Sequence, residues 1–184
     1  WGENVYPILN GHMGCVEFEE LGTAVYGLSY HQREITEGLY DHMTAPKRQP
    51  IEILLAHGGD EKHIPIKKDV LDNLGYAYVA MGHIHKPQVL IPNKIIYAGA
   101  LEPIDKNDTG EHGYVRGIIT SHGVRTEFIP SAKRSYIHQE IWIDETVTNS
   151  SLKDLIRGKI QELGLENIYK FILKGYRQAD IVFE

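Results

Sequence analysis

Short apolar runs, separated by charged or turn-forming residues, mark the chain up to about residue 130. The runs are rich in Val, Ile, Leu and Tyr, and runs of this length and composition favour β-strands. The predicted strands are residues 5–9, 16–20, 23–28, 51–57, 76–82, 94–98, 114–120 and 124–129. Short strands with few helices between them indicate a layered α/β domain.

Two segments of this region have helical spacing. Residues 32–43 are one candidate helix. Residues 66–74 are a better defined one, because Pro65 stands just before them and Gly75 stands where a left-handed cap would fall.

The pattern changes after Pro130, where a β-α-β unit is predicted. Residues 136–143 alternate as a strand, residues 151–163 follow helical spacing, and residues 167–175 return to a strand pattern. A unit of this size is marginal alone, so we expect it to pack against the preceding domain.

The helix at residues 151–163 is the clearest element of the chain. Ser151 is its expected cap, with Asp154 three residues later, and Gly164 is its expected end. One apolar stripe is formed by Leu152, Leu155, Ile156, Ile160 and Leu163.

Length and composition set the domain organisation. The 184 residues, 42% of them hydrophobic, allow one core of ordinary size and a small second unit. We therefore expect one domain over residues 1–130 and a small one over residues 131–184. Because the sequence opens on Trp1 and a predicted strand follows almost at once, we also expect the natural protein to extend upstream.

The cellular setting is predicted from what the sequence lacks. No apolar run approaches the roughly 20 residues of a membrane-spanning helix, so no membrane partner is expected. The one cysteine, Cys15, has no disulfide partner, and no secretory signal pattern opens the sequence. These features favour the cytoplasm.

The net charge of −6 is unevenly distributed. Residues 1–130 hold 11 Lys and Arg against 17 Asp and Glu, whereas residues 131–184 hold 8 of each. This balance argues against broad electrostatic attraction to DNA. It suits bound cations, and a solvated acidic surface explains it equally well.

The strongest chemical signal is Gly82-His83-Ile84-His85, directly after the apolar residues 76–81. Alternate residues of an extended chain point to one side, so His83 and His85 are expected to face a common pocket while Ile84 faces the core. The two histidines would lie at the carboxyl edge of the sheet, where open α/β sheets bind ligands.

A second apolar strand ends in His57, which Gly58 and Gly59 follow. If the two strands are neighbours, His57 joins His83 and His85 at one edge of the sheet. Three neutral imidazoles suit Mn, Zn or Fe better than Mg or Ca. An isolated histidine at a strand end is more often a surface or capping residue, so the prediction depends on the three together.

These motifs resemble those of the calcineurin-like metallophosphoesterases. In that superfamily a strand-terminal His, followed by small residues and by Gly-His-x-His some 25 residues later, forms the last two of five metal-binding motifs. The context is similar to the SbcD-type DNA double-strand-break repair exonucleases. That likeness is carried by residues 24–30 (AVYGLSY), 78–88 (YVAMGHIHKPQ), 96–103 (IYAGALEP) and 110–115 (GEHGYV).

The resemblance implies a fold and a site. The chain would be the carboxy-terminal half of a calcineurin-like αββα sandwich followed by a small α/β capping domain that helps to hold DNA. His57 and His83 would bind one metal and His85 the other, in a pair of Mn-like ions. It also implies an SbcC-like coiled-coil ATPase as partner, and a homodimer stays open.

The departures from the family pattern matter as much. The Asp-x-His, Gly-Asp-x-x-Asp and Gly-Asn-His-Asp/Glu motifs, which come earlier in that family, are not found in this sequence. Two segments match these motifs incompletely and at the wrong positions, namely Asn10-Gly11-His12 and Gly59-Asp60-Glu61. We therefore predict that the chain is the carboxy-terminal part of a nuclease, carries no separate catalytic residue and is nearly inactive alone.

Other assignments stay open. Lys133 and Arg134 could contact a DNA phosphate, although a basic pair is usually only solvated surface. The chain could instead be a non-catalytic scaffold or DNA-docking module, or part of a metallophosphatase with another phosphoester substrate. The remaining histidines share no ligand-like spacing, so surface or structural roles are expected for His12, His31, His42, His63, His112, His122 and His138.

Overall fold

A computed structural model describes residues 2–179 and residue 182 of the chain. It divides the chain into two compact units. The first comprises Trp1–Leu101 and Gly113–Pro130, and the second comprises Glu102–His112 and Ser131–Glu184. Within the described residues, no helix has the length and apolar composition needed to cross a membrane.

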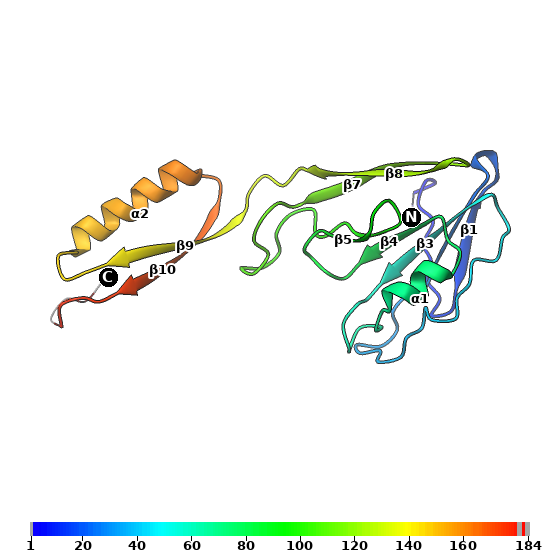
Figure 1. Cartoon of the computed structure of the whole chain (residues 1–184), viewed down its shortest axis with the longest axis horizontal. Helices are drawn as coiled ribbons and strands as arrows, with labels where there is room; N and C mark the ends of the chain where they lie inside the picture. Colours follow the sequence, from blue (N-terminus) through cyan, green and yellow to red (C-terminus); the bar gives the residue numbers. More distant parts are fainter. Residues whose placement is uncertain (1, 180–181, 183–184) are drawn as a thin grey trace. The chain divides into compact units, whose positions relative to one another are not determined.

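The first unit is built on a six-stranded sheet in the order β1-β2-β3-β4-β6-β5 (Figure 1). Strands β2, β3, β4 and β6 are parallel, and β1 and β5 pair antiparallel at the two edges. The strands are β1 (Gly14–Phe18), β2 (Thr23–Gly27), β3 (Ile51–His57), β4 (Tyr78–Gly82), β5 (Gln88–Ile91) and β6 (Ile95–Tyr97). This arrangement confirms the predicted α/β class.

One face of this sheet supplies the main core. In β3, alternate residues Glu52, Leu54 and Ala56 are buried, as the period-two pattern predicts. Helix α1 (Lys68–Asn73) contributes Leu71 to the same hydrophobic cluster. Figure 1 shows α1 along one side of the sheet and the β7–β8 hairpin along the other.

The hairpin forms a third layer of the first unit. Strands β7 (Gly113–Thr120) and β8 (Gly123–Pro130) pair antiparallel along their whole length. The hairpin is fastened to the sheet by Thr126, whose backbone N–H donates to Asn93 Oδ1 at 2.9 Å. An apolar cavity of about 230 Å³ lies between the layers, lined by Ile53, Tyr78, Ala80, Val115, Gly117, Ile119, Val124 and Thr126.

The second unit contains the predicted β-α-β motif. Strands β9 (Tyr136–Ile143) and β10 (Ile168–Gly175) are parallel, and α2 (Asn149–Leu163) connects them. Thr148 caps α2 and forms a capping box with Ser151, so the prediction that Ser151 is the cap was wrong by three residues. Gly164 ends the helix with φ 108°, as expected.

Two predicted elements do not form. Residues 5–9 are not a strand, because Pro7 has no N–H for a ladder and the segment is fixed instead by Ser29, which donates to the carbonyl of Ile8. Residues 32–43 are not a helix. Residues 38–43 form short turns, as in the bond from Met43 N to Tyr40 O, and Ile35 pairs outside the segment: its N–H donates to Lys62 O, and its carbonyl accepts from Ile64 N.

Candidate metal centre

The site lies where β3 and β4 end side by side. The two strands are parallel neighbours, and their register sets His57 opposite Gly82. The sequence turns after Gly82, and the ring of His83 lies with its centroid 5.3 Å from that of His57. The structure thus places two of the predicted histidines, His57 and His83, side by side.

His83 departs from the extended conformation that the sequence analysis assumed. Strand β4 ends at Gly82, and His83 has φ +93°. The extended backbone that was assumed at His83 is therefore wrong, whereas a common pocket for His83 and His85 stays a prediction. Exposed His85 follows in the next loop, where its carbonyl accepts from Ala100 N at 2.8 Å. A positive φ in a non-glycine residue is costly and is often found at functional sites.

The loop after β3 adds two residues that sequence reasoning missed. Asp60 Oδ2 lies 2.7 Å from His83 Nε2, and both Asp60 oxygens lie 2.9 Å from His63 Nδ1. The rings of His63 and His83 have centroids 4.5 Å apart. A surface or structural role was predicted for His63, and its hydrogen bond to Asp60 is a structural one. The available signal was the spacing His57, Asp60, His63 in one short segment after a strand.

Two glycines make this loop possible. Gly58 has φ 149° and Gly59 has φ 132°. A Cβ on Gly59 would lie 2.2 Å from the hydroxyl oxygen of Tyr97, and one on Gly58 would lie 2.4 Å from the carbonyl oxygen of His63. The chain can fold back tightly only without these side chains, and this fold brings Asp60 to His83.

Three tyrosine hydroxyls hold the backbone at the start of the loop. His57 N–H donates to Tyr40 Oη at 2.9 Å, and Tyr40 is 1% exposed. Tyr97 Oη donates to the carbonyl of Gly58 at 2.9 Å, and Tyr30 Oη donates to the carbonyl of His57 at 3.3 Å. The Tyr30 ring also meets the His57 ring edge-on, with centroids 5.3 Å apart. The residues around His57 are therefore positioned from several sides.

The electrostatics of the site favour metal binding. Hydrogen bonds from His83, then from His63, hold the pKa of Asp60 well below its usual range, so its carboxylate is ionised. Burial, followed by the nearby charges of His83 and His63, lowers the pKa of His57. A neutral imidazole and an ionised carboxylate are the protonation states that bind cations.

The ligand atoms of Asp60, His63 and His83 all lie within 4.8 Å of one another. This group offers one oxygen and two nitrogens, a set suited to Zn, Mn, Fe or Co. His57 adds a further imidazole beside the group. The predicted roles of His57, His83 and His85 as metal ligands stay predictions.

The predicted DNA contacts lie in the second unit. Lys133 and Arg134 are both exposed in the segment that leads into β9, and Lys133 N donates to Glu102 Oε1 at 2.9 Å.

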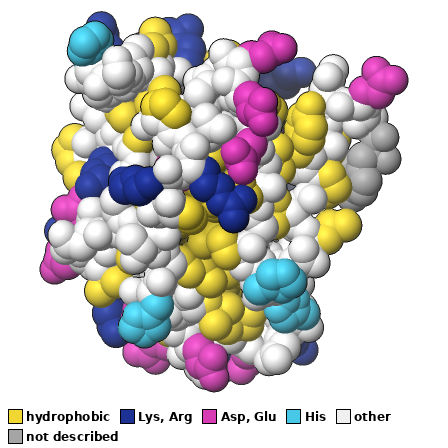
Figure 2. All heavy atoms as spheres, turned by 90° about the vertical axis from the view of Figure 1, so that its right-hand side faces the viewer, with side chains coloured by type: hydrophobic (Ala, Val, Ile, Leu, Met, Phe, Trp, Pro, Cys, Tyr) yellow, Lys and Arg dark blue, Asp and Glu magenta, His cyan; other side chains and the backbone are white. Residues whose placement is uncertain are grey.

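Figure 2 shows Lys and Arg side chains on one face of the molecule interspersed with acidic and hydrophobic ones. That face carries no continuous basic field, in keeping with the net charge of −6.

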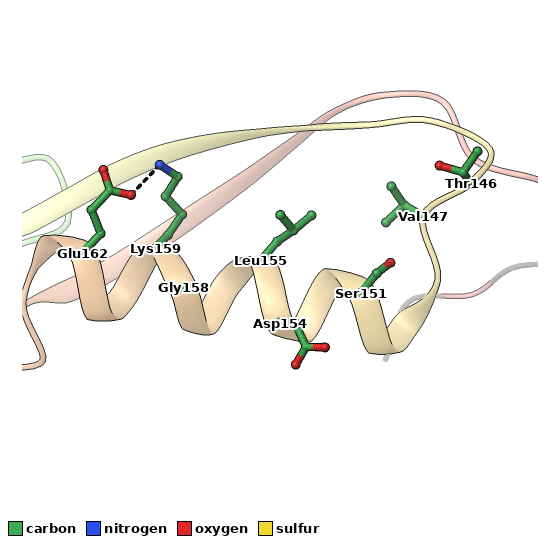
Figure 3. A pocket seen from close by; sticks show the side chains of 8 residues that line it. All are labelled: Thr146, Val147, Ser151, Asp154, Leu155, Gly158, Lys159 and Glu162. Atoms are coloured by element: carbon green, nitrogen blue, oxygen red, sulfur yellow. Dashed lines mark hydrogen bonds and ion pairs between the residues drawn. The ribbon is translucent and has the colours of Figure 1, made fainter.

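A groove along α2 has a different character. It measures about 720 Å³ and is lined by Thr146, Val147, Ser151, Asp154, Leu155, Gly158, Lys159 and Glu162 (Figure 3). Lys159 pairs with Glu162 at 2.7 Å, and Asp154 pairs with Arg157 at 3.3 Å. Because its charged side chains neutralise one another, we assign no chemistry to this groove.

Comparison with known proteins supports the reaction class that the sequence motifs indicate. No family model matches the chain. One distant relative is a metallophosphoesterase, which supports the calcineurin-like metallophosphoesterase superfamily, and the α/β sheet fits that fold. This relative is the uncharacterized metallophosphoesterase YhaO of Bacillus subtilis (strain 168), 27% identical over 166 residues. The match covers 84% of this chain but only 39% of the relative, so the chain spans well under half of that protein.

Proposed function

We propose that this chain is part of a metal-dependent phosphoester hydrolase. The observation that carries the proposal is the convergence of imidazole and carboxylate side chains at the ends of two neighbouring strands. The relationship to a metallophosphoesterase supports the same reaction class. Binding clefts at the carboxyl edge of parallel strands are the usual place for ligands in open α/β sheets.

The residues of this chain would bind and orient the metal ions. By resemblance, His57 and His83 would bind one ion and His85 a second. Two Mn-like ions would lower the pKa of the attacking water and stabilise the charge that gathers on the phosphate oxygens. The hydrogen bonds of Tyr40 and Tyr97 to the backbone would keep His57 in place, as supporting groups do around metal ligands.

We propose DNA as the substrate, in a repair nuclease of the SbcD type. The sequence around Gly82-His83-Ile84-His85 supports this choice through its likeness to that family. Lys133 and Arg134 would then contact phosphates, an SbcC-like ATPase would be the partner, and the cytoplasm would be the setting. The relative spans more than twice the length of this chain, and the missing upstream motifs would have to come from such additional sequence.

A smaller phosphoester is the second candidate substrate. The observation in its favour is charge: residues 1–130 hold 11 basic against 17 acidic side chains. A net negative surface repels a long polyanion more strongly than it repels a small phosphate ester.

The proposed hydrolase function is tested by measuring Mn²⁺-dependent hydrolysis. The protein to use is the longest natural polypeptide that contains this chain. Linear double-stranded DNA, bis-p-nitrophenyl phosphate and p-nitrophenyl phosphate should be compared, since only a phosphatase prefers the monoester. We expect cleavage of the two diesters, a loss of at least about 100-fold for His83→Ala, and no change for the exposed His42→Ala. Activity that survives EDTA, or that His57→Ala and His83→Ala leave intact, would exclude the proposed function.

A further inference from the structure

The carboxylate of Asp60 accepts hydrogen bonds from two imidazoles that belong to different parts of the first unit. His63 lies in the same loop as Asp60, and His83 follows the end of β4. We propose that Asp60 is a positioning residue, which holds the ring of His83 in one orientation and in one tautomer. The inference rests on the proposed function: it keeps His57 and His83 as the expected metal ligands and assigns the group that orients one of them.

The hydrogen bonds of Asp60 use its whole accepting capacity. Its Oδ2 lies 2.7 Å from His83 Nε2, and both of its oxygens lie 2.9 Å from His63 Nδ1. Its Oδ1 also accepts from the backbone N–H of Lys62 at 2.8 Å and from that of His63 at 3.0 Å. A carboxylate offers about four lone-pair positions, and these donors occupy them. Asp60 therefore serves as an acceptor that anchors its neighbours, and a cation could reach it only by displacing a donor.

The contact with Asp60 decides which nitrogen of His83 carries the proton. Because an ionised carboxylate only accepts, a neutral His83 carries its proton on Nε2 and keeps its lone pair on Nδ1. A metal bound by His83 is then bound through Nδ1. In metal sites the ligating imidazole commonly donates its other N–H to a carboxylate, which fixes the ring and makes it more basic.

The backbone alone does not position the ring of His83. Strand β4 ends at Gly82, and His83 has φ +93°, outside the extended conformation. The ring lies beside that of His63, with centroids 4.5 Å apart, and His63 is itself bonded to Asp60. Asp60 thus joins the two rings into one unit, and loss of its carboxylate would free both.

The competing interpretation is that Asp60 only stabilises the turn of its own loop. Its bonds to the backbone N–H groups of residues 62 and 63 are typical of such a turn. A role confined to the turn does not depend on the tautomer of His83. The two interpretations therefore differ in what they predict for the imidazole of His83.

Nuclear magnetic resonance of the metal-free, untagged 184-residue chain tests the proposal. With isotope-labelled histidine, two-bond proton–nitrogen correlations show which ring nitrogen carries the proton. At a pH where the imidazoles are neutral, we expect His83 in the Nε2–H form and His63 in the Nδ1–H form. His138 is the internal reference, because its Nε2 donates to the carbonyl of Lys106 at 2.7 Å within the second unit.

The variant Asp60→Ala should release both rings. We expect His63 to lose its fixed Nδ1–H form and His83 to show a mixture of the two tautomers, while His138 is unchanged. The backbone amide spectrum checks that the chain stays folded. If His83 of the unmodified chain carried its proton on Nδ1, or if folded Asp60→Ala kept both tautomers, the positioning role would be wrong.

Hydrolysis by the longest natural polypeptide that contains this chain gives a second readout. Asp60→Asn should lower kcat for Mn²⁺-dependent cleavage about 10–100-fold with little change in KM, because a misoriented ligand weakens the metal site rather than substrate binding. Asp69, whose side chain is 92% exposed in α1, provides the matched control Asp69→Ala, which should keep the unmodified kcat. Undiminished hydrolysis by Asp60→Asn would overturn the positioning role and leave the hydrolase function standing. Absence of hydrolysis in the unmodified polypeptide would instead overturn the function, whatever the tautomer of His83.

Discussion

Asp60 Oδ2 lies 2.7 Å from His83 Nε2, although 23 positions separate the two residues in the chain. The contact joins the loop after β3 to the end of β4, and the parallel pairing of these strands brings the two segments together. A hydrogen bond of this length between a carboxylate and an imidazole is charge-assisted and strong. The fold thus places an anion directly against a predicted metal ligand.

The positive φ of His83 predicts that a glycine variant at this position is more stable than an alanine variant. With φ +93°, a residue with a Cβ is strained, whereas glycine is not. We expect His83→Gly to be more stable than His83→Ala by about 1 kcal/mol, although both lose the imidazole. Urea denaturation measures the difference. The control is the same pair of variants at His42, where φ is not positive: there His42→Ala should be more stable than His42→Gly. If His83→Ala were as stable as His83→Gly, the backbone at residue 83 would not be strained.

Two neighbouring tyrosines should respond oppositely to loss of the hydroxyl. The rings of Tyr26 and Tyr76 lie 5.8 Å apart, and both side chains are buried. Tyr26 Oη donates to Glu52 at 2.9 Å, whereas the hydroxyl of Tyr76 is buried without a hydrogen-bond partner among the described residues. Tyr76→Phe should be neutral or stabilising by up to about 1 kcal/mol, and Tyr26→Phe should cost about 1–3 kcal/mol.

Urea unfolding of the two phenylalanine variants checks this prediction. Each change removes a single oxygen from a core of similar packing, so each variant is the control of the other. Equal losses of stability in the two variants would mean that the Tyr76 hydroxyl has a partner in solution, such as an ordered water.

Glu52 should make stability depend on acid pH. Although burial alone would raise its pKa, the N–H groups of Lys47 and Arg48 and the Tyr26 hydroxyl outweigh burial, and the pKa is lowered. A lowered folded-state pKa gives stability that is present above the unfolded-state value and lost as pH falls through about 4.5 and below. Glu52→Gln should cost roughly 2 kcal/mol at pH 7 and show a smaller loss of stability between about pH 5 and pH 3.

Chemical denaturation at several pH values measures this effect. Glu17, which is on the surface and pairs with Arg48 at 3.4 Å, offers a control, because an exposed ion pair contributes little. If Glu52→Gln and Glu17→Gln gave parallel stability curves below pH 5, the buried carboxylate would not be the group responsible.

Strand bounds were predictable where a period-two pattern coincides with burial. The bounds of β3 and β9 agree with the sequence prediction to the residue, since both alternate and both contribute to a core. The predicted helix at residues 32–43 failed because Ile35 bonds to residues 62 and 64, about 30 positions away. Helix propensity depends on the residues of the segment itself, so it cannot predict a contact with residues so far along the chain.

The candidate site was predictable only in part, for a similar reason. A histidine at the end of each apolar strand indicated that His57 and His83 would be neighbours, and parallel pairing confirms it. Asp60 and His63 join them only because Gly58 and Gly59 fold the loop back, which depends on the three-dimensional space left beside Tyr97.

Gly59→Ala should disturb this loop through two separable effects. A Cβ there would lie 2.2 Å from Tyr97 Oη, and φ 132° is itself unfavourable for alanine. Gly123 has a similar φ of 141° with nothing within 4 Å of an added Cβ, so Gly123→Ala reports the backbone effect alone. We expect Gly59→Ala to cost at least about 1 kcal/mol more than Gly123→Ala.

The double variant Gly59→Ala/Tyr97→Phe isolates the clash. Removing Tyr97 Oη leaves the added Cβ at 3.2 Å from Tyr97 Cζ, so the steric part is relieved while the backbone part stays. Urea unfolding of both single variants and the double variant should therefore give a favourable coupling energy of about 1 kcal/mol or more. Additive losses would mean that the loop moves away from Tyr97 at little cost, and Asp60 would then be held less firmly than its hydrogen bonds indicate.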